Sequence, residues 1–387
     1  REGAHSYLLI ANPSRWQVQQ RRRQPRVLLA DEVPLEACAS GKTFIGWVQD
    51  VSAGGMRLFA PLPLSEGTVL QLDIPPSLKG ALSEGIRTAR VRACKRTLHR
   101  HDYAGVSLEI IVVDNASADG SAEMVRTGFP EVVLIANAEN RGFGAGCNQG
   151  LRVAQGRYAL ILNADARPQQ HALARLVAFM DAHPEAAACG GQLRYPDGRI
   201  QPSCAGELTL WAVFCEQTML EKLFPKTRLF GGYWRTWWDF SSTIETEQLM
   251  GACLMLRRQP DGAFPEFDEA YFLYCEDTDL CYRLRRAGGK LYYVHDAIFV
   301  HHLGASGEGQ RAEMVIYYNR GKERFFRKFH GALPAALCFL LNQFGALLRW
   351  LIGFSLTILT LGRVARYRRY ASIFWRVFWR RMPNARQ

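Results

Sequence analysis

The sequence lacks any C-x-x-C pair, and its ten cysteines are scattered singly along 387 residues. This spacing excludes the common structural zinc sites and argues against a secreted domain held together by disulfides. No signal-peptide pattern opens the sequence, so we expect the cysteines to be small core residues in a reducing cytoplasm. Zinc-finger, helix-turn-helix and RNP patterns are also lacking, which argues against nucleic acid as a partner.

The composition indicates a globular protein with an excess of positive charge. Apolar residues make up 48% and charged residues 22%, and the length predicts two or three folded units. The net charge of +12 favours anionic partners such as nucleotides or an acidic membrane surface. Arginines gather in two places, at residues 21–26 and within residues 363–381.

Changes of pattern divide the chain into parts. After a lead-in at 1–20, residues 21–109 contain short apolar alternations between Gly, Pro and Ser clusters, which predicts a small antiparallel β-barrel. Residues 110–330 alternate apolar strands with helical segments, which predicts a Rossmann-like α/β sheet with ligand groups at the carboxyl ends of its strands. Residues 331–387 are rich in apolar and basic side chains.

The C-terminal part predicts membrane-associated helices. Two apolar stretches, Leu333–Leu348 and Trp350–Leu361, are separated by Arg349. Together they are long enough to cross a bilayer, but an arginine in mid-span is unfavourable, and two helices lying in the membrane interface fit as well. A buried helical hairpin of a soluble enzyme is the remaining alternative. The basic stretch that follows suits an anionic cytoplasmic leaflet.

A first group of candidate ligand-binding residues lies within 21–109. Arg22 and Arg26 offer planar donors that suit phosphate and can stack on a purine. Downstream, Asp50 can accept from a guanine edge, Ser52 adds a hydroxyl, and Gly55 allows a turn that a side chain would block. Taken separately, the two segments also fit an exposed basic linker and an ordinary turn.

The order R-x-x-x-R followed by D-x-S-x-x-G inside a small β domain resembles the PilZ family. The segment Tyr103–Glu109 also looks like the last strand of that family's barrel. The resemblance implies that cyclic di-GMP is a regulatory ligand and that its binding residues are Arg22, Arg26, Asp50, Ser52 and Gly55.

A second group of polar residues begins at the ends of apolar runs within 110–330. Asp114 ends one run, while Asn163 and Asp165 end another. Oxygen ligands of this kind suit Mg²⁺ or Mn²⁺. Between them, the glycine-rich segment Asn140–Gly150 leads into a predicted helix, and such an entry allows close approach of a diphosphate.

Further acidic and histidine residues complete this group. Glu276, Asp277 and Asp279 open a predicted helix, where the helix dipole favours carboxylates, and one carboxylate can act as a general base. His301 and His302 follow an apolar strand and can complete a metal shell. Each piece has an ordinary alternative, since acids after strands often cap helices and a histidine pair is usually structural. Their succession in one domain is what favours a sugar-nucleotide site.

The succession V-V-D-N-A-S, N-R-G-F-G-A-G-C-N-Q-G, L-N-A-D, Y-P-D-G, G-A-C and Y-C-E-D-T-D-L resembles glycosyltransferase family 2, especially its rhamnosyltransferase-like members. The resemblance covers residues 110–320 and implies a GT-A fold, a divalent metal (Mg or Mn), and a displacement that inverts the anomeric carbon. It makes Asp277 the catalytic base. By the same resemblance the nucleotide-sugar is bound by Asp114, Asn115, Asn140, Gly142, Asn148 and Asp165, and the metal by Asn163, Asp165 and His301.

Two departures from the family pattern stand out. The metal motif reads N-x-D where many members have D-x-D, so Asn163 supplies a neutral oxygen. The strand and helix that usually precede V-V-D-N-A-S are not found between the PilZ-like segment and Ile111. This loss predicts impaired catalysis and keeps open an alternative, in which the chain is a cyclic di-GMP receptor whose transferase domain is a scaffold.

The sequence as a whole predicts an inverting glycosyltransferase regulated by cyclic di-GMP. We expect it to move a sugar such as rhamnose from a nucleotide-sugar donor to a surface polysaccharide or lipid-linked saccharide acceptor. The expected location is the cytoplasmic face of the bacterial inner membrane.

Overall fold

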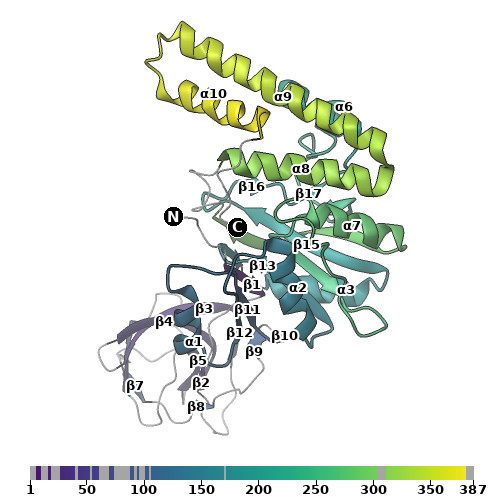
Figure 1. Ribbon diagram of the computed structural model, residues 1–387. Coiled ribbons are helices and arrows are strands. Elements are labelled where there is room, and N and C mark those ends of the chain that lie inside the picture. Colours follow the sequence, from purple (N-terminus) through teal and green to yellow (C-terminus); the bar gives the residue numbers. More distant parts are fainter. Residues whose placement is uncertain are drawn as a thin grey trace.

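The computed structural model of the chain describes side chains for residues 108–169, 171–302 and 311–380 (Figure 1). Before residue 108 it describes only the backbone of the strands. The predictions for Arg22 and Arg26 therefore lie outside the described residues.

A ten-stranded sheet forms the centre of the α/β part. Eight of its strands follow one another in space as β12 (Val133–Ala136), β11 (Ile111–Asp114), β1 (Ser6–Leu9), β13 (Tyr158–Asn163), β20 (Cys253–Arg257), β15 (Ala186–Arg194), β21 (Lys290–His301) and β14 (Ala166–Pro168). The short strands β16 (Ile200–Gln201) and β18 (Ile244–Glu245) pair with β15 and β21. Neighbours are parallel in β12–β11 and β15–β21 and antiparallel in the other pairs.

The N-terminal strand β1 occupies the middle of this sheet. It runs antiparallel to β11 on one side and to β13 on the other, with Tyr7 opposite both Val113 and Asn163. The sequence predicted only a lead-in at 1–20 and a transferase domain without its first strand. β1 comes from near the N-terminus and takes the place of that strand. Without it, the edges of β11 and β13 that face each other would have no strand between them.

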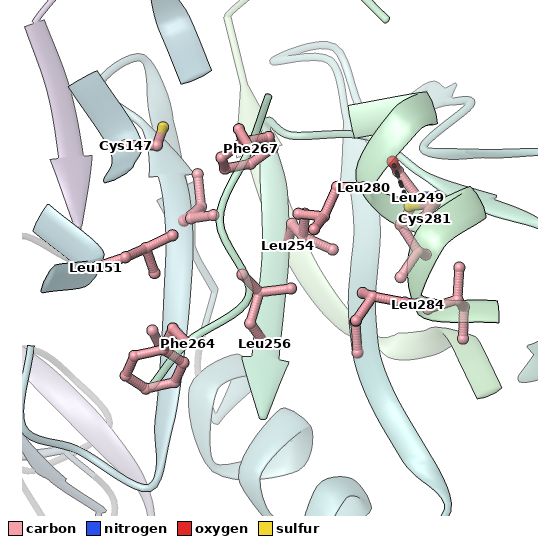
Figure 2. Packing of buried hydrophobic residues seen from close by; sticks show 14 of the residues in the cluster. Cys147, Leu151, Leu249, Leu254, Leu256, Phe264, Phe267, Leu280, Cys281 and Leu284 are labelled. Carbon is pink, nitrogen blue, oxygen red and sulfur yellow. Dashed lines mark hydrogen bonds between the residues drawn. The ribbon is translucent and has the colours of Figure 1, made fainter. Parts of the chain in front are cut away.

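Side chains that alternate along the strands form two cores, one on each face of the sheet. On one face, Leu254 and Leu256 of β20 pack among α2 (Phe143–Val153) and α7 (Glu276–Arg286), as Figure 2 shows. On the other face, β20 contributes Met255, which packs with α3 (Ala172–Ala182). The eight cysteines whose side chains are described are all free and buried, as expected for core residues.

A seven-stranded antiparallel sheet precedes the α/β part. Its strand order is β7 (Thr88–Arg90), β6 (Val69–Asp73), β3 (Val27–Ala39), β4 (Lys42–Ser52), β5 (Gly55–Ala60), β2 (Trp16–Val18) and β8 (Cys94–Lys95). The sheet thus contains β2, which lies before the predicted domain start at residue 21. The all-antiparallel pairing agrees with the predicted β class of residues 21–109.

The predicted last strand of the β domain has a different role. β9 (His101–Tyr103) and β10 (Val106–Leu108) pair with each other in a separate two-stranded sheet. Leu108 is buried in the core between α3 and the ten-stranded sheet. Residues 106–108 therefore contribute to the packing of the α/β part.

Helices occur between β17 (Cys204–Ala205) and β18, and they make up most of residues 311–378. α8 (Arg311–His330), α9 (Ala332–Leu359) and α10 (Ala365–Phe378) lie side by side beyond the sheet (Figure 1). Gly331 separates α8 from α9. The remaining elements are α1 (Ser121–Gly128), β17 (Cys204–Ala205), α4 (Leu210–Gln217), α5 (Leu220–Leu223), α6 (Arg228–Gly231) and β19 (Gln248–Leu249).

Candidate functional site

The predicted site residues converge on one edge of the ten-stranded sheet. β11 and β13 are both antiparallel to β1 and hence point the same way, and β21 shares this direction through β20 and β15. The carboxyl ends of these strands carry Asp114, Asn163 and His301. The topology thus brings the predicted strand-end residues to one edge of the sheet.

Asn115 is the centre of a hydrogen-bond network on the β11 side of this edge. Its side chain is fully buried, and Nδ2 donates to Asn140 Oδ1 at 2.9 Å and to the Gly142 carbonyl at 3.0 Å. Its Oδ1 accepts from Asn137 Nδ2 at 3.1 Å and from the Arg141 amide at 3.0 Å. The predicted nucleotide residues Asn115, Asn140 and Gly142 are therefore joined in one hydrogen-bond network.

The entry of α2 depends on Gly142. This residue has φ +88°, and a Cβ there would lie 2.5 Å from the carbonyl oxygen of Phe272. The amide of Phe143 donates to the same oxygen at 2.9 Å. The start of α2 is thereby joined to the segment that precedes α7, so that the glycine-rich loop and the acidic helix share one border.

Asn148 has a different position from the one that the resemblance implied. Its side chain is fully buried and makes two hydrogen bonds with the backbone of Phe267, at 3.0 and 2.8 Å. Its Nδ2 also donates to Glu269 at 3.0 Å. Because the amide is used within the protein, Asn148 holds the 267–269 loop on α2 and is not placed to contact a donor directly.

Asp165 and His301, two of the predicted metal ligands, lie next to each other. Asp165 Oδ1 lies 3.1 Å from His301 Nε2, and the other ring nitrogen, Nδ1, lies 3.0 Å from Gln201 Oε1. An amide oxygen can only accept, so Nδ1 carries a hydrogen, and in the neutral ring Nε2 presents a lone pair. Two acceptors then face each other, an arrangement that a proton or a shared cation stabilises.

The donor set at this point fits a divalent cation. Asn163 Nδ2 lies 3.4 Å from His301 Nε2, and its buried Oδ1 has no hydrogen-bond partner among the described residues. Ligands about 2.1 Å from Mg²⁺ at right angles lie about 3 Å apart, close to the observed separation of Asp165 and His301. The described residues contain no group of three or more His, Cys, Asp or Glu that could hold a metal. A divalent metal bound by only two such side chains would have coordination positions left for a diphosphate and water.

The acidic turn of α7 contains three carboxylates in three different environments. Asp279 is fully buried and ion-paired, with Arg283 Nε at 2.6 Å and Lys328 Nζ at 2.6 Å. Asp277 is partly exposed, and its Oδ2 accepts from the Gly251 amide at 3.1 Å and its Oδ1 from the Thr278 amide at 2.8 Å. The oxygens of Asp277 are thus held by neutral amides, whereas the ion pairs of Asp279 make that residue structural.

Glu276 and Asp277 differ in how strongly their surroundings raise the pKa of each carboxyl. Burial, and then the charge of Asp277, raises the pKa of Glu276 well above 4.5, and its Oε2 has no partner among the described residues. Burial also raises the pKa of Asp277, but hydrogen bonds from the backbone amides of Gly251 and Thr278 oppose the increase. Neighbouring carboxyls whose pKa values differ can serve as one acid and one base.

The backbone before α7 is strained. Tyr274 and Cys275 are consecutive residues with φ +67° each, a region that non-glycine residues rarely adopt. Such strain costs about 1–3 kcal/mol per residue and is common at functional sites. It turns the chain sharply into α7 and sets the position of Asp277.

The segment Gly251–Ala252 links Asn163, a predicted metal ligand, to Asp277. The Asn163 amide donates to the Ala252 carbonyl at 3.1 Å, and the adjacent Gly251 amide donates to Asp277 Oδ2 at 3.1 Å. The backbone of Asn163 and the side chain of the predicted base are therefore linked through two residues, Gly251 and Ala252.

Comparison with known families agrees with this arrangement. A family model described as Glycosyl transferase family 2 matches residues 89–234, and a PilZ domain model matches residues 20–124. The chain joins a PilZ domain to a family 2 glycosyltransferase domain. The two matches overlap at 89–124, which includes the strand pair β9–β10. The α/β part accordingly has a GT-A-like fold.

Known relatives are sugar transferases. The chain is 26% identical over 240 residues to an N-acetylglucosaminyl-diphospho-decaprenol L-rhamnosyltransferase of Mycobacterium tuberculosis, covering 58% of this chain and 76% of the relative. It is 54% identical over 66 residues to a rhamnosyltransferase of Escherichia coli, covering 16% of this chain and 25% of the relative. A solved mannosyltransferase from Pyrobaculum calidifontis, in complex with GDP-Man and Mn²⁺, is 18% identical, with 71% and 79% covered and a TM-score of 0.37.

The PilZ domain is described only as backbone. Asp50 and Ser52 lie on β4, and Ser52 pairs with Gly55 at the start of β5, so three of the predicted cyclic di-GMP residues share one hairpin. A register shift between Val48 and Asp50 marks an irregularity in β4 just before them.

Two residues of the transferase site were not found from sequence. Gln201 fixes the His301 ring, but it lies on a two-residue strand without any motif. Glu276 was noted only as part of an acidic cluster, because its burial depends on tertiary packing. Burial and partner identity are the signals that distinguish them.

Proposed function

We propose that the chain transfers a sugar from a nucleotide-sugar to a saccharide acceptor with inversion at the anomeric carbon. The observation that supports this most is the backbone link through Gly251–Ala252, because it connects the backbone of Asn163, two residues before Asp165, with the carboxylate of Asp277. A displacement reaction needs both a metal site and a base, with the leaving diphosphate on one side and the attacking hydroxyl on the other.

The donor is held at the strand ends. Asp114, 3% exposed at the end of β11, reads the base or ribose, and the Asn115–Asn140–Gly142 loop shapes the approach to the diphosphate. Asn163, Asp165 and His301 would hold a divalent metal, which neutralises charge on the leaving diphosphate. Gln201 keeps the His301 ring in the tautomer that presents Nε2.

Asp277 is the base in this proposal. As the acceptor oxygen forms its bond to the anomeric carbon, the bond from that carbon to the diphosphate oxygen breaks, and the hydroxyl proton moves to Asp277. The amides of Gly251 and Thr278 keep the carboxylate oriented and favour its ionised form. In this proposal Glu276, the residue before Asp277, stays protonated.

The acceptor class follows from the relatives. The mycobacterial relative is named for a lipid-linked saccharide precursor and for rhamnose. By analogy we propose rhamnose as the donor sugar and a lipid-linked saccharide or growing surface polysaccharide as the acceptor. Such an acceptor places the enzyme on a membrane surface, at the cytoplasmic face of the inner membrane.

Cyclic di-GMP is proposed to regulate the transfer through the PilZ domain. Arg22, Arg26, Asp50, Ser52 and Gly55 match the family's binding residues, and the hairpin that carries the last three supports their proximity. Calorimetric titration should give binding that Arg22→Ala removes while donor binding is unchanged. If wild-type protein shows no heat of binding, the regulatory part of the proposal is wrong.

Transfer can be measured directly. Purified chain is incubated with dTDP- and UDP-sugars, a short lipid-linked saccharide and Mn²⁺, and products are analysed by mass spectrometry and NMR. We expect one donor to give a product of inverted anomeric configuration, with activity lost in the presence of a chelator and restored by Mn²⁺. A retained configuration would contradict the single displacement.

A second candidate is a cyclic di-GMP receptor with an inactive transferase domain. The position of β1 favours this candidate. This central strand comes from a distant part of the chain, and it runs antiparallel to both neighbours. This candidate predicts cyclic di-GMP binding together with no detectable binding of any nucleotide-sugar in the presence of Mn²⁺. Donor binding by the wild-type chain would exclude it.

A further inference from the structure

Helix α9 has its small and polar residues on the inside of the protein. Its buried residues recur at intervals of one helical turn, so they form one continuous face. This inner face consists of Ala335, Cys338, Asn342, Gly345, Ala346, Arg349 and Gly353. A helix of an ordinary soluble domain has the reverse pattern, with its large apolar side chains inward.

The inner face is bound to the protein along most of its length. Arg349 donates to the carbonyls of Glu216 at 2.7 Å and Gln217 at 3.0 Å, both on α4. Asn342 donates to Glu323 of α8 at 2.9 Å. Near the other end, a Cβ at Gly353 would lie 2.9 Å from the Ala371 amide nitrogen, so α10 also approaches closely.

The outer face of α9 is apolar and has no partner among the described residues. Spacings of three, four and seven residues place its side chains on one line opposite the inner face. Their exposed fractions are Leu333 72%, Leu337 42%, Leu340 59%, Phe344 50%, Leu351 46% and Ile358 57%. An unbroken line of this kind is a large exposed apolar patch for a soluble protein.

The same helical layer is basic and rich in aromatic residues at one end. The sequence from Ala332 to Phe378 contains no Asp or Glu. Four arginines around the start of α10 are exposed, namely Arg363, Arg366, Arg368 and Arg369. Trp375 and Trp379, one turn apart, are exposed by 39% and 53%. Arginine and tryptophan beside an apolar face suit the boundary between anionic headgroups and acyl chains.

We propose that α9 lies in the plane of an anionic phospholipid membrane, with its outer face among the acyl chains and the arginines of α10 at the headgroups. This inference rests on the membrane association in the proposed function and specifies its geometry. It also assigns Arg349 to the protein interior, which resolves the difficulty that a mid-span arginine posed.

Length alone would allow a different arrangement. By length and composition alone, the 28 residues of α9 are enough to cross a bilayer. A crossing helix would have to leave α4, α8 and α10, and would expose the side chains of Arg349 and Asn342 to hydrocarbon without their hydrogen-bond partners. The hydrogen bonds of the inner face therefore favour the in-plane arrangement.

Vesicle sedimentation tests the surface. The full chain is added to preformed vesicles of phosphatidylcholine, with or without phosphatidylglycerol. We expect binding that increases with phosphatidylglycerol, decreases at least tenfold in Leu340→Ser/Phe344→Ser, and loses its lipid-charge dependence in Arg366→Gln/Arg369→Gln. Matched controls are the exposed pairs Met124→Ser/Val153→Ser and Arg126→Gln/Arg199→Gln, which should bind as the wild type does.

Labelling tests the orientation. Ala332→Cys and Thr360→Cys, at the two ends of α9, are treated with a membrane-impermeant maleimide on sealed vesicles, with wild-type background subtracted. Labelling of both ends from outside is expected, and labelling of one end only would overturn the proposal in favour of a spanning helix. A different result would assign the face to a second copy of the chain. In that case the wild type would not bind vesicles and would sediment as a dimer, and Leu340→Ser/Phe344→Ser would make it monomeric.

The two proposals can fail separately. Transfer to a water-soluble saccharide acceptor tests the transferase without any membrane. Vesicle binding without such transfer would leave the docking surface standing and remove the proposed activity. Transfer without vesicle binding would support the proposed activity and remove the docking surface.

Discussion

Asp165 Oδ1 and His301 Nε2 lie 3.1 Å apart, although 136 residues (301 − 165) separate them in sequence. The strand pairing that joins them is β14 with β21, in which Ala166 is opposite His301. The His302 amide also donates to the Asp165 carbonyl at 3.0 Å. Backbone pairing at this edge of the sheet therefore holds Asp165 and His301 next to each other.

Gln201→Leu should weaken metal use without unfolding the protein. Loss of the hydrogen bond to Nδ1 frees the His301 ring to rotate and to change tautomer. Removal of such a partner typically lowers metal affinity or activity about 10–100-fold. The measurement is the Mn²⁺ concentration that gives half-maximal transfer, and high Mn²⁺ should restore the rate. Gln201→Glu should retain most of the affinity, and Gln155→Leu, at an exposed position, is the control.

Glu276→Gln should make the protein less sensitive to alkaline pH. The folded state raises the pKa of this carboxyl, so between the ordinary value of 4.5 and the raised one the folded state binds more protons than the unfolded chain. Stability then decreases as pH rises through that window, because the linkage slope is negative. Thermal melts at pH 5 and pH 8 should show a smaller decrease in Tm for the variant, by about 2–4 °C for each kcal/mol relieved. An unchanged difference would mean that Glu276 is ionised in the folded state.

Gly142→Ala should impair both folding and donor binding. The added Cβ would meet the Phe272 carbonyl oxygen at 2.5 Å, in addition to the strain of φ +88°. Gly198→Ala is the matched control, since Gly198 has φ +85° and a Cβ added there would have no heavy atom within 4 Å beyond its chain neighbours. The control should lose about 1–3 kcal/mol of unfolding free energy from backbone strain alone, and Gly142→Ala clearly more. Equal losses in urea melts would show that the contact with Phe272 is not rigid.

Leu8→Pro should destabilise the transferase sheet. Residue 8 of β1 is opposite both Val112 and Leu162, so a proline removes a backbone donor in the middle of the sheet. We expect a lower Tm, more aggregation through the open edges of β11 and β13, and weaker donor binding. Leu8→Val retains the backbone donor and is the control. A proline variant with wild-type Tm would show that β1 does not pair in this position.

The strand-end residues could be predicted from sequence because they are local. Asp114 and Asn163 each end a buried apolar run, and the carboxyl ends of strands that point the same way meet at one edge of a sheet. Asp277 was found in the same way, from an acidic first helical turn after an aromatic run. A local pattern thus identifies which residues are functional candidates, without giving their partners.

Other features depend on contacts between distant residues. Asn148 lies in the glycine-rich motif, but its hydrogen bonds go to Phe267, 119 residues away, and make it structural. β1 contains only four residues, and its pairing with β11 spans about a hundred residues of chain, so no periodicity could place it in the sheet. In the C-terminal part the apolar composition predicted membrane helices, whereas the burial of Arg349 became visible only from its contacts with α4.

The role of Asp277 is tested most directly by the rate of transfer in Asp277→Asn. The variant keeps the shape of the side chain but cannot accept the acceptor's proton, so we expect transfer to fall about 10²–10⁴-fold while donor binding measured by calorimetry is unchanged. Asp261→Asn, an exposed turn residue, should behave as the wild type. Transfer by Asp277→Asn at a rate near that of the wild type would contradict the account, because no carboxylate base would then be needed at this position.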